Sequence, residues 1–173
     1  LRKASDNIPV TLANAHPFFH DGWAFIHNGT VYDAESLPRD ASLVTISDES
    51  DTEYLFHYFL SAITKNPVDN SIGETLARAV SSLTVDYTAV NSLLSNGEDL
   101  YVICAYKKWS DYYTLHYYPL PAGVIISSQP IESSRLEPAR WNRLAEDLLL
   151  RIHGSPPKID KIPIQIHCNE GKL

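Results

Sequence analysis

Hydrophobic residues recur at helical spacing in two stretches near the middle of the chain. The first begins at Ser50-Asp51-Thr52-Glu53, where a serine followed three residues later by a glutamate has the form of a helix capping box. Apolar side chains then repeat at intervals of three and four residues, at Leu55, Phe56, Phe59, Leu60 and Ile63. A similar stripe runs through Ile72–Leu83. The pattern predicts two consecutive amphipathic helices packed on one face of a sheet.

The hydrophobic period changes to two in the second half of the chain, which predicts β-strands. One strand is expected at Leu100–Tyr106, after a turn at Asn96-Gly97. Further strands are expected at Tyr113–Tyr118 and Gly123–Ser128. The segment Leu144–Ile152 fits either a helix or a short buried strand. The sequence therefore predicts an α+β fold in which a β-meander follows a helical pair.

The stretch from Asn14 to Tyr32 combines a strand pattern with polar residues. The apolar run Trp23–Ile26 leads into Asn28-Gly29, and a short run from Thr30 to Tyr32 follows, which predicts a hairpin with its turn at Asn28-Gly29. Such a turn would point the Asn28 amide and the Gly29 N–H in one direction, as a two-donor hole for an oxyanion requires. The alternative is a purely structural role, because Asn-Gly is a very common hairpin turn.

Composition narrows the classes of function. The chain has 173 residues, is 44% hydrophobic and carries a formal net charge of -7 with scattered basic residues, so we expect one domain that binds neither nucleic acid nor a membrane. Residues 155–173 are expected to form a Pro-containing tail. With two cysteines, no leader and no long apolar segment, a cytoplasmic location is expected. The absence of methionine and the start at Leu-Arg-Lys indicate an N-terminally incomplete chain.

The cysteines and histidines give little sign of independent chemistry. Cys104 lies among apolar residues of a predicted strand, so we expect an inert core side chain, whereas Cys168 falls in the expected tail. His16 and His20 have a spacing that could bind a metal, but Pro17 lies between them and no carboxylate or cysteine is close in sequence. We expect no metal and no cofactor.

Four blocks of sequence, taken together, resemble a known family. They are Leu-Arg-Lys-Ala-Ser at 1–5, Asn-Ala-His-Pro-Phe at 14–18, His-Asn-Gly-Thr-Val at 27–31 and Ser-Asp-Thr-Glu at 50–53. Their order and spacing resemble the glutaminase domain of the class II, N-terminal-nucleophile glutamine amidotransferases. The residues within the blocks are most similar to those of the stand-alone branch, which includes γ-glutamyl hydrolases. The resemblance runs from Leu1 to about Trp141. It implies an αββα four-layer sandwich of two antiparallel sheets between helices, here missing its N-terminal strands.

The resemblance also implies roles for individual residues. Arg2 and Ser5 would form the floor of a glutamine pocket, with the planar guanidinium of Arg2 gripping the α-carboxylate. Asp51 would pair with the α-ammonium while Ser50 caps the helix, and Asn28 with Gly29 would form the oxyanion hole. From the residues alone, Arg2 could equally be a solvated terminus and Asp51 a carboxylate that complements the helix dipole.

The family's nucleophile is a cysteine at the mature N-terminus, whose own α-amine acts as the base, and this chain begins with Leu1. The resemblance thus implies an enzyme that hydrolyses the γ-amide of glutamine or a γ-glutamyl compound through a cysteine not present here, so this chain alone is expected to be inactive. The alternatives are a non-catalytic relative that binds a γ-glutamyl ligand or a partner protein, and a small-ligand module built on Tyr101–Tyr118. The expected partner is a small-molecule substrate, with a homo-oligomer or partner chain completing the fold.

Overall fold

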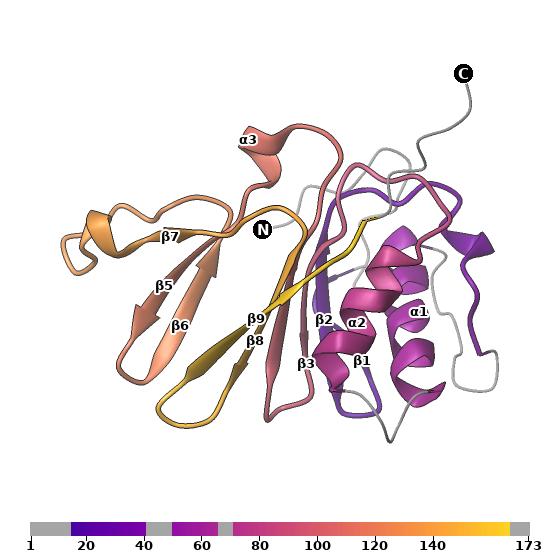
Figure 1. Ribbon diagram of the computed structural model, residues 1–173, viewed down its shortest axis with the longest axis horizontal. Helices are drawn as coiled ribbons and strands as arrows, with labels where there is room; N and C mark the ends of the chain where they lie inside the picture. Colours follow the sequence, from indigo (N-terminus) through magenta and orange to yellow (C-terminus); the bar gives the residue numbers. More distant parts are fainter. Residues whose placement is uncertain (1–14, 41–49, 66–70, 167–173) are drawn as a thin grey trace.

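Two helices and six strands form the larger part of the molecule. The computed structural model describes residues 15–40, 50–65 and 71–166. Helices α1 (Asp51–Lys65) and α2 (Ile72–Ser81) form where the apolar stripes predict them, and lie against one face of a sheet (Figure 1). Each begins at a serine whose Oγ accepts a backbone N–H at 3.2 Å, Ser50 from Glu53 and Ser71 from Glu74. The capping prediction for Ser50 is confirmed.

The strands form two antiparallel sheets, as predicted. The larger sheet has the order β1 (Phe18–His20), β2 (Trp23–Asn28), β3 (Asn91–Ser95), β4 (Leu100–Cys104), β8 (Leu148–His153) and β9 (Lys158–Pro163). The smaller sheet has the order β6 (Gly123–Ser127), β5 (His116–Leu120) and β7 (Asn142–Arg143). Short helical turns are η1 (Ala34–Ser36), α3 (Ser110–Tyr113) and η2 (Pro138–Arg140). The α+β class with two antiparallel sheets is thereby confirmed.

The larger sheet is buried on both faces. On the helical side Phe25 of β2 stacks on Phe56 of α1, with ring centroids 5.0 Å apart. On the opposite side Val102 and Cys104 belong to a second apolar cluster, against which Tyr117 of the smaller sheet packs. Because side chains alternate along a strand, this two-sided burial makes almost all of β4 apolar and explains why its hydrophobic pattern is so strong.

The predicted hairpin at Asn28-Gly29 is wrong. The turn lies instead at Asp21-Gly22, where φ is 44° and 78°, and it joins β1 to β2 with His20 opposite Trp23. Two successive residues with positive φ are characteristic of the two-residue type I′ turn, which Asp-Gly favours as strongly as Asn-Gly does. After Gly29 the chain leaves the sheet and Val31 forms an isolated bridge with Tyr87.

The second half of the chain does not form the single continuous β-meander that the sequence predicted. After β4 the chain forms β5 and β6 in the smaller sheet and then returns to the larger one, where β8 pairs with β4. The ambiguous segment Leu144–Ile152 thus contains a strand. The expected tail at 155–173 is wrong for Lys158–Pro163, since these residues form β9 at the sheet edge. An edge strand tolerates Pro163 because its outer N–H positions need no partner.

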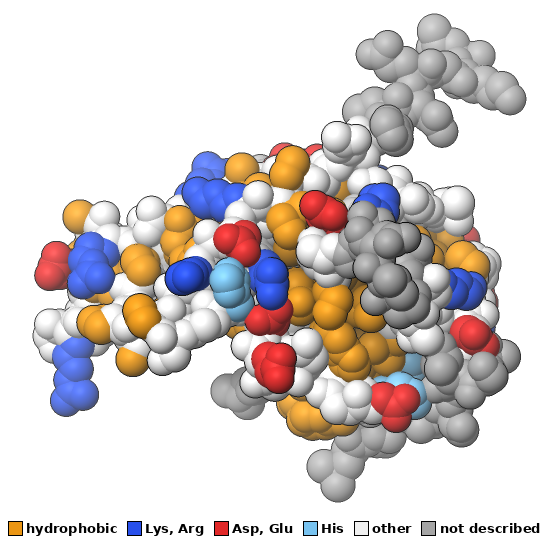
Figure 2. Space-filling model, turned by 60° about the horizontal axis from the view of Figure 1, so that its bottom comes forward, with side chains coloured by type: hydrophobic (Ala, Val, Ile, Leu, Met, Phe, Trp, Pro, Cys, Tyr) orange, Lys and Arg blue, Asp and Glu red, His pale blue; other side chains and the backbone are white. Residues whose placement is uncertain are grey.

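Charges on the face seen in Figure 2 are mixed, with acidic and basic side chains interspersed. Two side-chain contacts join neighbouring parts of the larger sheet: the Arg151 Nε donates to Asp99 Oδ2 at 2.8 Å, and His153 Nε2 lies 3.0 Å from Asp160 Oδ2. None of the helices in the described ranges is long and apolar enough to cross a membrane.

His57 makes the stability of the fold depend on pH. This side chain of α1 is buried, and burial lowers the pKa of His57 from 6.5 to about 4; Glu53 opposes the shift, whereas His20 and Arg39 add to it. Between these two values the unfolded chain binds a proton that the folded chain does not. The free energy of unfolding should therefore fall as pH decreases from 6.5 towards 4.

We expect His57→Gln to flatten this dependence, because glutamine stays neutral throughout the window. Urea unfolding at several pH values measures the slope, independently of any constant loss of stability from the substitution. The matched control is His116→Gln, which removes a histidine from the smaller sheet. An unchanged slope in His57→Gln would show that other groups cause the acid sensitivity.

Candidate functional site

Asn28 is the last residue of β2, the second strand of the larger sheet, and Gly29 follows it. Asn28 is exposed and sits opposite Asn91 of β3. Phe25 and His27 are buried towards the helices, so alternation along the strand directs the Asn28 side chain to the other face. Within the described ranges, neither the Asn28 amide nor the Gly29 N–H donates to a protein group. Both donors are therefore available to a ligand.

The backbone at Gly29 is packed too closely for any other residue. A Cβ at this position would lie 1.9 Å from the carbonyl oxygen of Ala89, and φ is 158°, outside the range that other residues usually adopt. Glycine is therefore required by a close approach between two backbone segments, and not by the tight turn that the sequence predicted.

His27 connects three segments beneath Gly29. Its Nε2 lies 3.1 Å from the Ala89 carbonyl oxygen and its Nδ1 lies 3.2 Å from Thr52 Oγ1. Because a carbonyl only accepts, the His27 Nε2–H is the donor to Ala89. The end of β2 is thus joined to the first turn of α1. The sequence analysis assigned roles to Asn28 and Gly29 but none to His27, which directly precedes them.

Asp51 lies beside the segment that follows Gly29. Its Oδ2 accepts from the Val31 N–H at 3.0 Å, and its Oδ1 accepts from the Thr52 N–H at 2.8 Å. The residue therefore does more than complement the dipole of α1, since it holds a distant strand segment. Each carboxylate oxygen can accept more than one hydrogen bond, so Asp51 retains capacity for an ammonium group.

A second set of contacts holds the same segment on its other side. Thr30 N–H donates to Thr88 Oγ1 at 2.9 Å, and this oxygen lies 3.1 Å from the Tyr113 hydroxyl. The Asn91 amide donates to the Tyr113 carbonyl. Sequence reasoning missed Thr88, Asn91 and Tyr113 because these contacts join residues far apart in the chain, and no local pattern records them.

The remaining predicted residues divide into two groups, those outside the described part of the chain and Cys104. Arg2, Ser5 and Cys168 lie outside the described residues. Cys104 is fully buried, and burial raises the pKa of its thiol to about 11, so the prediction of an inert core cysteine is confirmed. In the described part of the chain, no group of three or more His, Cys, Asp or Glu side chains could hold a metal ion.

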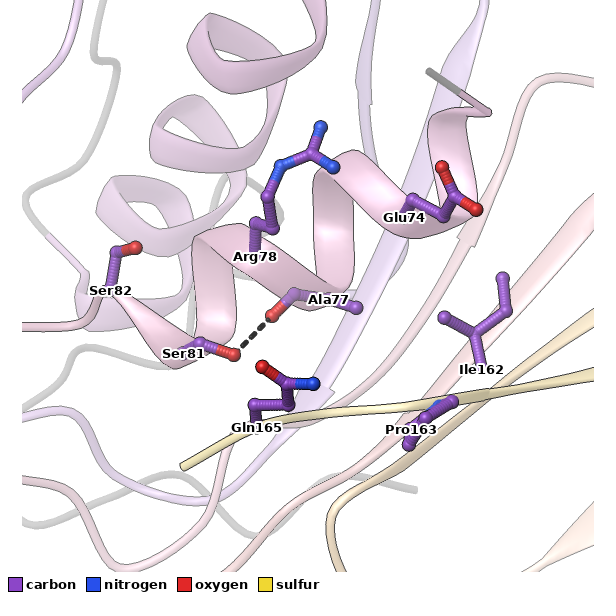
Figure 3. Close-up of a pocket in the computed structure, with 8 residues that line it drawn as sticks. All are labelled: Glu74, Ala77, Arg78, Ser81, Ser82, Ile162, Pro163 and Gln165. Atoms are coloured by element: carbon purple, nitrogen blue, oxygen red, sulfur yellow. Dashed lines mark hydrogen bonds between the residues drawn. The ribbon is translucent and has the colours of Figure 1, made fainter. Parts of the chain in front are cut away.

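A well-formed hollow occurs away from these residues. It has a volume of about 510 Å3 and lies between α2 and the end of β9 (Figure 3). The lining residues are Glu74, Ala77, Arg78, Ser81, Ser82, Ile162, Pro163 and Gln165. Two of its polar groups are already engaged, because Ser81 Oγ donates to the Ala77 carbonyl at 2.9 Å and Arg78 donates to Thr75 at 3.2 Å. The available donors at Asn28 and Gly29 make the end of β2 the stronger candidate.

Comparison with known proteins identifies the family. A family model for class-II glutamine amidotransferases matches residues 1–146. An uncharacterized protein of Methanocaldococcus jannaschii is 34% identical over 122 residues, which make up 68% of this chain and 33% of that protein. The chain therefore spans about a third of the length of this curated relative.

Solved structures share the fold at lower sequence identity. A glutamine aminotransferase class-II domain protein from Silicibacter pomeroyi matches with a TM-score of 0.69 at 22% identity, over 91% of this chain and 74% of that chain. A predicted glutamine amidotransferase from Pseudomonas aeruginosa matches with a TM-score of 0.63 at 19% identity, over 84% and 65%. These likenesses confirm the predicted fold class.

The close approach at Gly29 leads to a stability prediction. Gly29→Ala should lower the free energy of unfolding by roughly 2–4 kcal/mol, because the new Cβ must displace the Ala89 carbonyl that His27 also binds. Gly97→Ala is the matched control: φ there is 89°, but nothing lies within 4 Å of the added Cβ. It should cost only about 1–2 kcal/mol of backbone strain. Equal losses in urea unfolding would contradict the packing argument.

Proposed function

The chain belongs to the class-II glutamine amidotransferases, and we propose that it hydrolyses the γ-amide of glutamine or of a γ-glutamyl compound when a cysteine-led segment precedes Leu1. The observation that carries the proposal is the pair of available donors, the Asn28 amide and the Gly29 N–H, in a segment that Asp51 holds two residues further on, at the Val31 N–H. In this proposal residues 1–173 act as one domain in a reducing cytoplasm, where a catalytic thiol stays reduced.

The donors at the end of β2 suit the charge that develops in amide hydrolysis. A cysteine thiolate attacks the γ-carbonyl carbon, a C–S bond forms, and the carbonyl oxygen takes the negative charge. Asn28 and Gly29 then donate to this oxyanion. The C–N bond breaks, the nitrogen takes a proton and leaves as ammonia, and water hydrolyses the thioester to give the γ-carboxylate. Cys104 cannot replace the nucleophile, because it is buried and its thiol pKa is raised to about 11.

Binding of the amino-acid end follows from charge complementarity. Asp51 would accept from the α-ammonium with the capacity that its two backbone hydrogen bonds leave. Arg2 would grip the α-carboxylate through two parallel hydrogen bonds, and Ser5 would add a hydroxyl at the pocket floor. Ser50 takes the capping bond of α1, so the Asp51 carboxylate need not serve as the cap.

The oxyanion role predicts a loss in turnover. In the full-length gene product, Asn28→Ala should lower kcat for L-glutamine roughly 10²- to 10³-fold with little change in stability, because one donor to the transition state is removed from an exposed position. Asn142→Ala, which removes an exposed asparagine from the smaller sheet, is the control. Unchanged kcat in Asn28→Ala would exclude this oxyanion hole. Glutamine binding without turnover in the unmodified protein would instead identify a non-catalytic relative.

The substrate-binding role predicts a loss of affinity on changing Asp51. Asp51→Asn should weaken L-glutamate binding in calorimetry roughly ten- to a hundredfold, since one charged hydrogen bond contributes about 1.5–3 kcal/mol. Its melting temperature should also fall, because Asp51 holds the Val31 N–H. Glu74→Gln removes an exposed first-turn carboxylate from α2 and is the control. A lower melting temperature with unchanged affinity would show that Asp51 is structural only.

A further inference from the structure

Exposed aromatic side chains gather in a hollow at α3. This hollow is shallow and open to solvent, and all the residues that line it lie in Trp109–Tyr113. Trp109 is 64% exposed and Tyr112 is 63% exposed, whereas the neighbouring Tyr113 is buried. Both exposed rings pack against the ring of Tyr113, so they form one aromatic cluster and differ from scattered surface apolar residues, which need no explanation. The hollow can therefore present ring faces to a ligand.

The backbone at Trp109 keeps this arrangement in place. Trp109 adopts φ 53° and ψ 57°, a left-handed conformation that is rare for a bulky residue. Its carbonyl accepts from the Tyr112 N–H at 2.8 Å and from the Tyr113 N–H at 3.0 Å. The Trp109 and Tyr112 rings lie 6.2 Å and 4.9 Å from the Tyr113 ring. Such strain occurs preferentially at functional sites.

The hollow is joined to the candidate site through Tyr113. Its hydroxyl lies 3.1 Å from Thr88 Oγ1, which accepts from the Thr30 N–H, and its carbonyl accepts from the Asn91 amide. Asn91 is paired with Asn28 across β2 and β3, so both side chains are on the sheet face opposite the helices. In Figure 1, α3 lies at the top of the view, between the ends of the two sheets.

The positions of Asp51, Asn28 and α3 define the orientation that a bound substrate would take. Asp51 belongs to α1, on the helical side of the larger sheet, whereas α3 is linked to Asn28 through Asn91 on the opposite side. A substrate with its amino-acid end at Asp51 and its γ-carbonyl oxygen at Asn28 and Gly29 would then extend its amide nitrogen towards α3. A group carried by that nitrogen would approach the exposed rings of Trp109 and Tyr112.

We propose that the Trp109–Tyr113 hollow is a subsite for an aromatic group on the amide nitrogen, so that the preferred substrates are N-aryl γ-glutamyl amides. The inference rests on the proposed function and specifies its substrate class. Stacked and edge-to-face contacts with Trp109 and Tyr112 supply the recognition. Asp111 is the charged residue among those lining the hollow, which favours a neutral or cationic ring over an anionic one.

The test compares two substrates in the full-length gene product, γ-L-glutamylanilide and L-glutamine. Trp109→Ala should lower kcat/KM for the anilide about tenfold and leave kcat/KM for glutamine within about twofold, because glutamine carries no ring. The quantity compared is the ratio of kcat/KM for the anilide to kcat/KM for glutamine, in the variant and in the unmodified protein. The different reactivity of the two leaving groups affects both ratios equally and so does not affect the comparison. Tyr112→Ala should act in the same direction. Phe19→Ala, which removes a side chain 74% exposed on β1, is the matched control and should change neither value.

The possible results separate the two proposals. If the full-length protein turns over neither substrate, the proposed function fails and the subsite fails with it. If glutamine is turned over and Trp109→Ala leaves the ratio unchanged, the hollow is not a subsite and the proposed function stands. If Trp109→Ala converts a dimer into a monomer in sedimentation while the ratio stays constant, the hollow is an interface between copies of the chain, which also overturns the inference.

Discussion

The Ala89 carbonyl is the point at which the candidate site is assembled. Gly29 packs against it so closely that no side chain fits, and the His27 Nε2–H donates to it at 3.1 Å. His27 also reaches Thr52 in the first turn of α1. The strand end, the segment before β3 and the helix start are therefore fixed together by backbone packing and one imidazole. The backbone of Gly29 is held in this way, so its N–H would need little reorganisation in the proposed oxyanion hole.

Burial of the larger sheet on both faces determines where such donors can be exposed. Helices cover one face and the smaller sheet packs on the other, so polar groups within the strands would be costly. The C-terminal end of β2 escapes this restriction, because Asn28 is exposed. There Asn28 is exposed on one face, while Asp51 approaches from the helical side. The proposed site therefore takes its groups from both sides of the sheet, which a position in the middle of a buried strand would not allow.

The sequence predicted those features that local signals determine. The capping box at Ser50 and the apolar spacing located α1 and α2, because both depend on neighbouring residues. Two pairs, Asp21-Gly22 and Asn28-Gly29, could each form a hairpin turn, and pairing of β2 with β3 decides between them. The strand at Lys158–Pro163 was missed because proline argues against a strand unless its edge position is known. Thr88 and Asn91 were missed because only the tertiary fold brings them to the site.

Asp51 makes one pair of hydrogen bonds that serves the fold and would also serve the proposed recognition of an ammonium group. A carboxylate at a helix start often caps the helix, but here Ser50 takes that bond. Asp51 is left to accept from Thr52 and, across the fold, from Val31. Its side chain is therefore already ordered before any ligand arrives, and an ammonium group would bind it with little further loss of conformational entropy. The contact that attaches the segment after Gly29 to α1 thus also orients the negative charge that the proposed substrate requires.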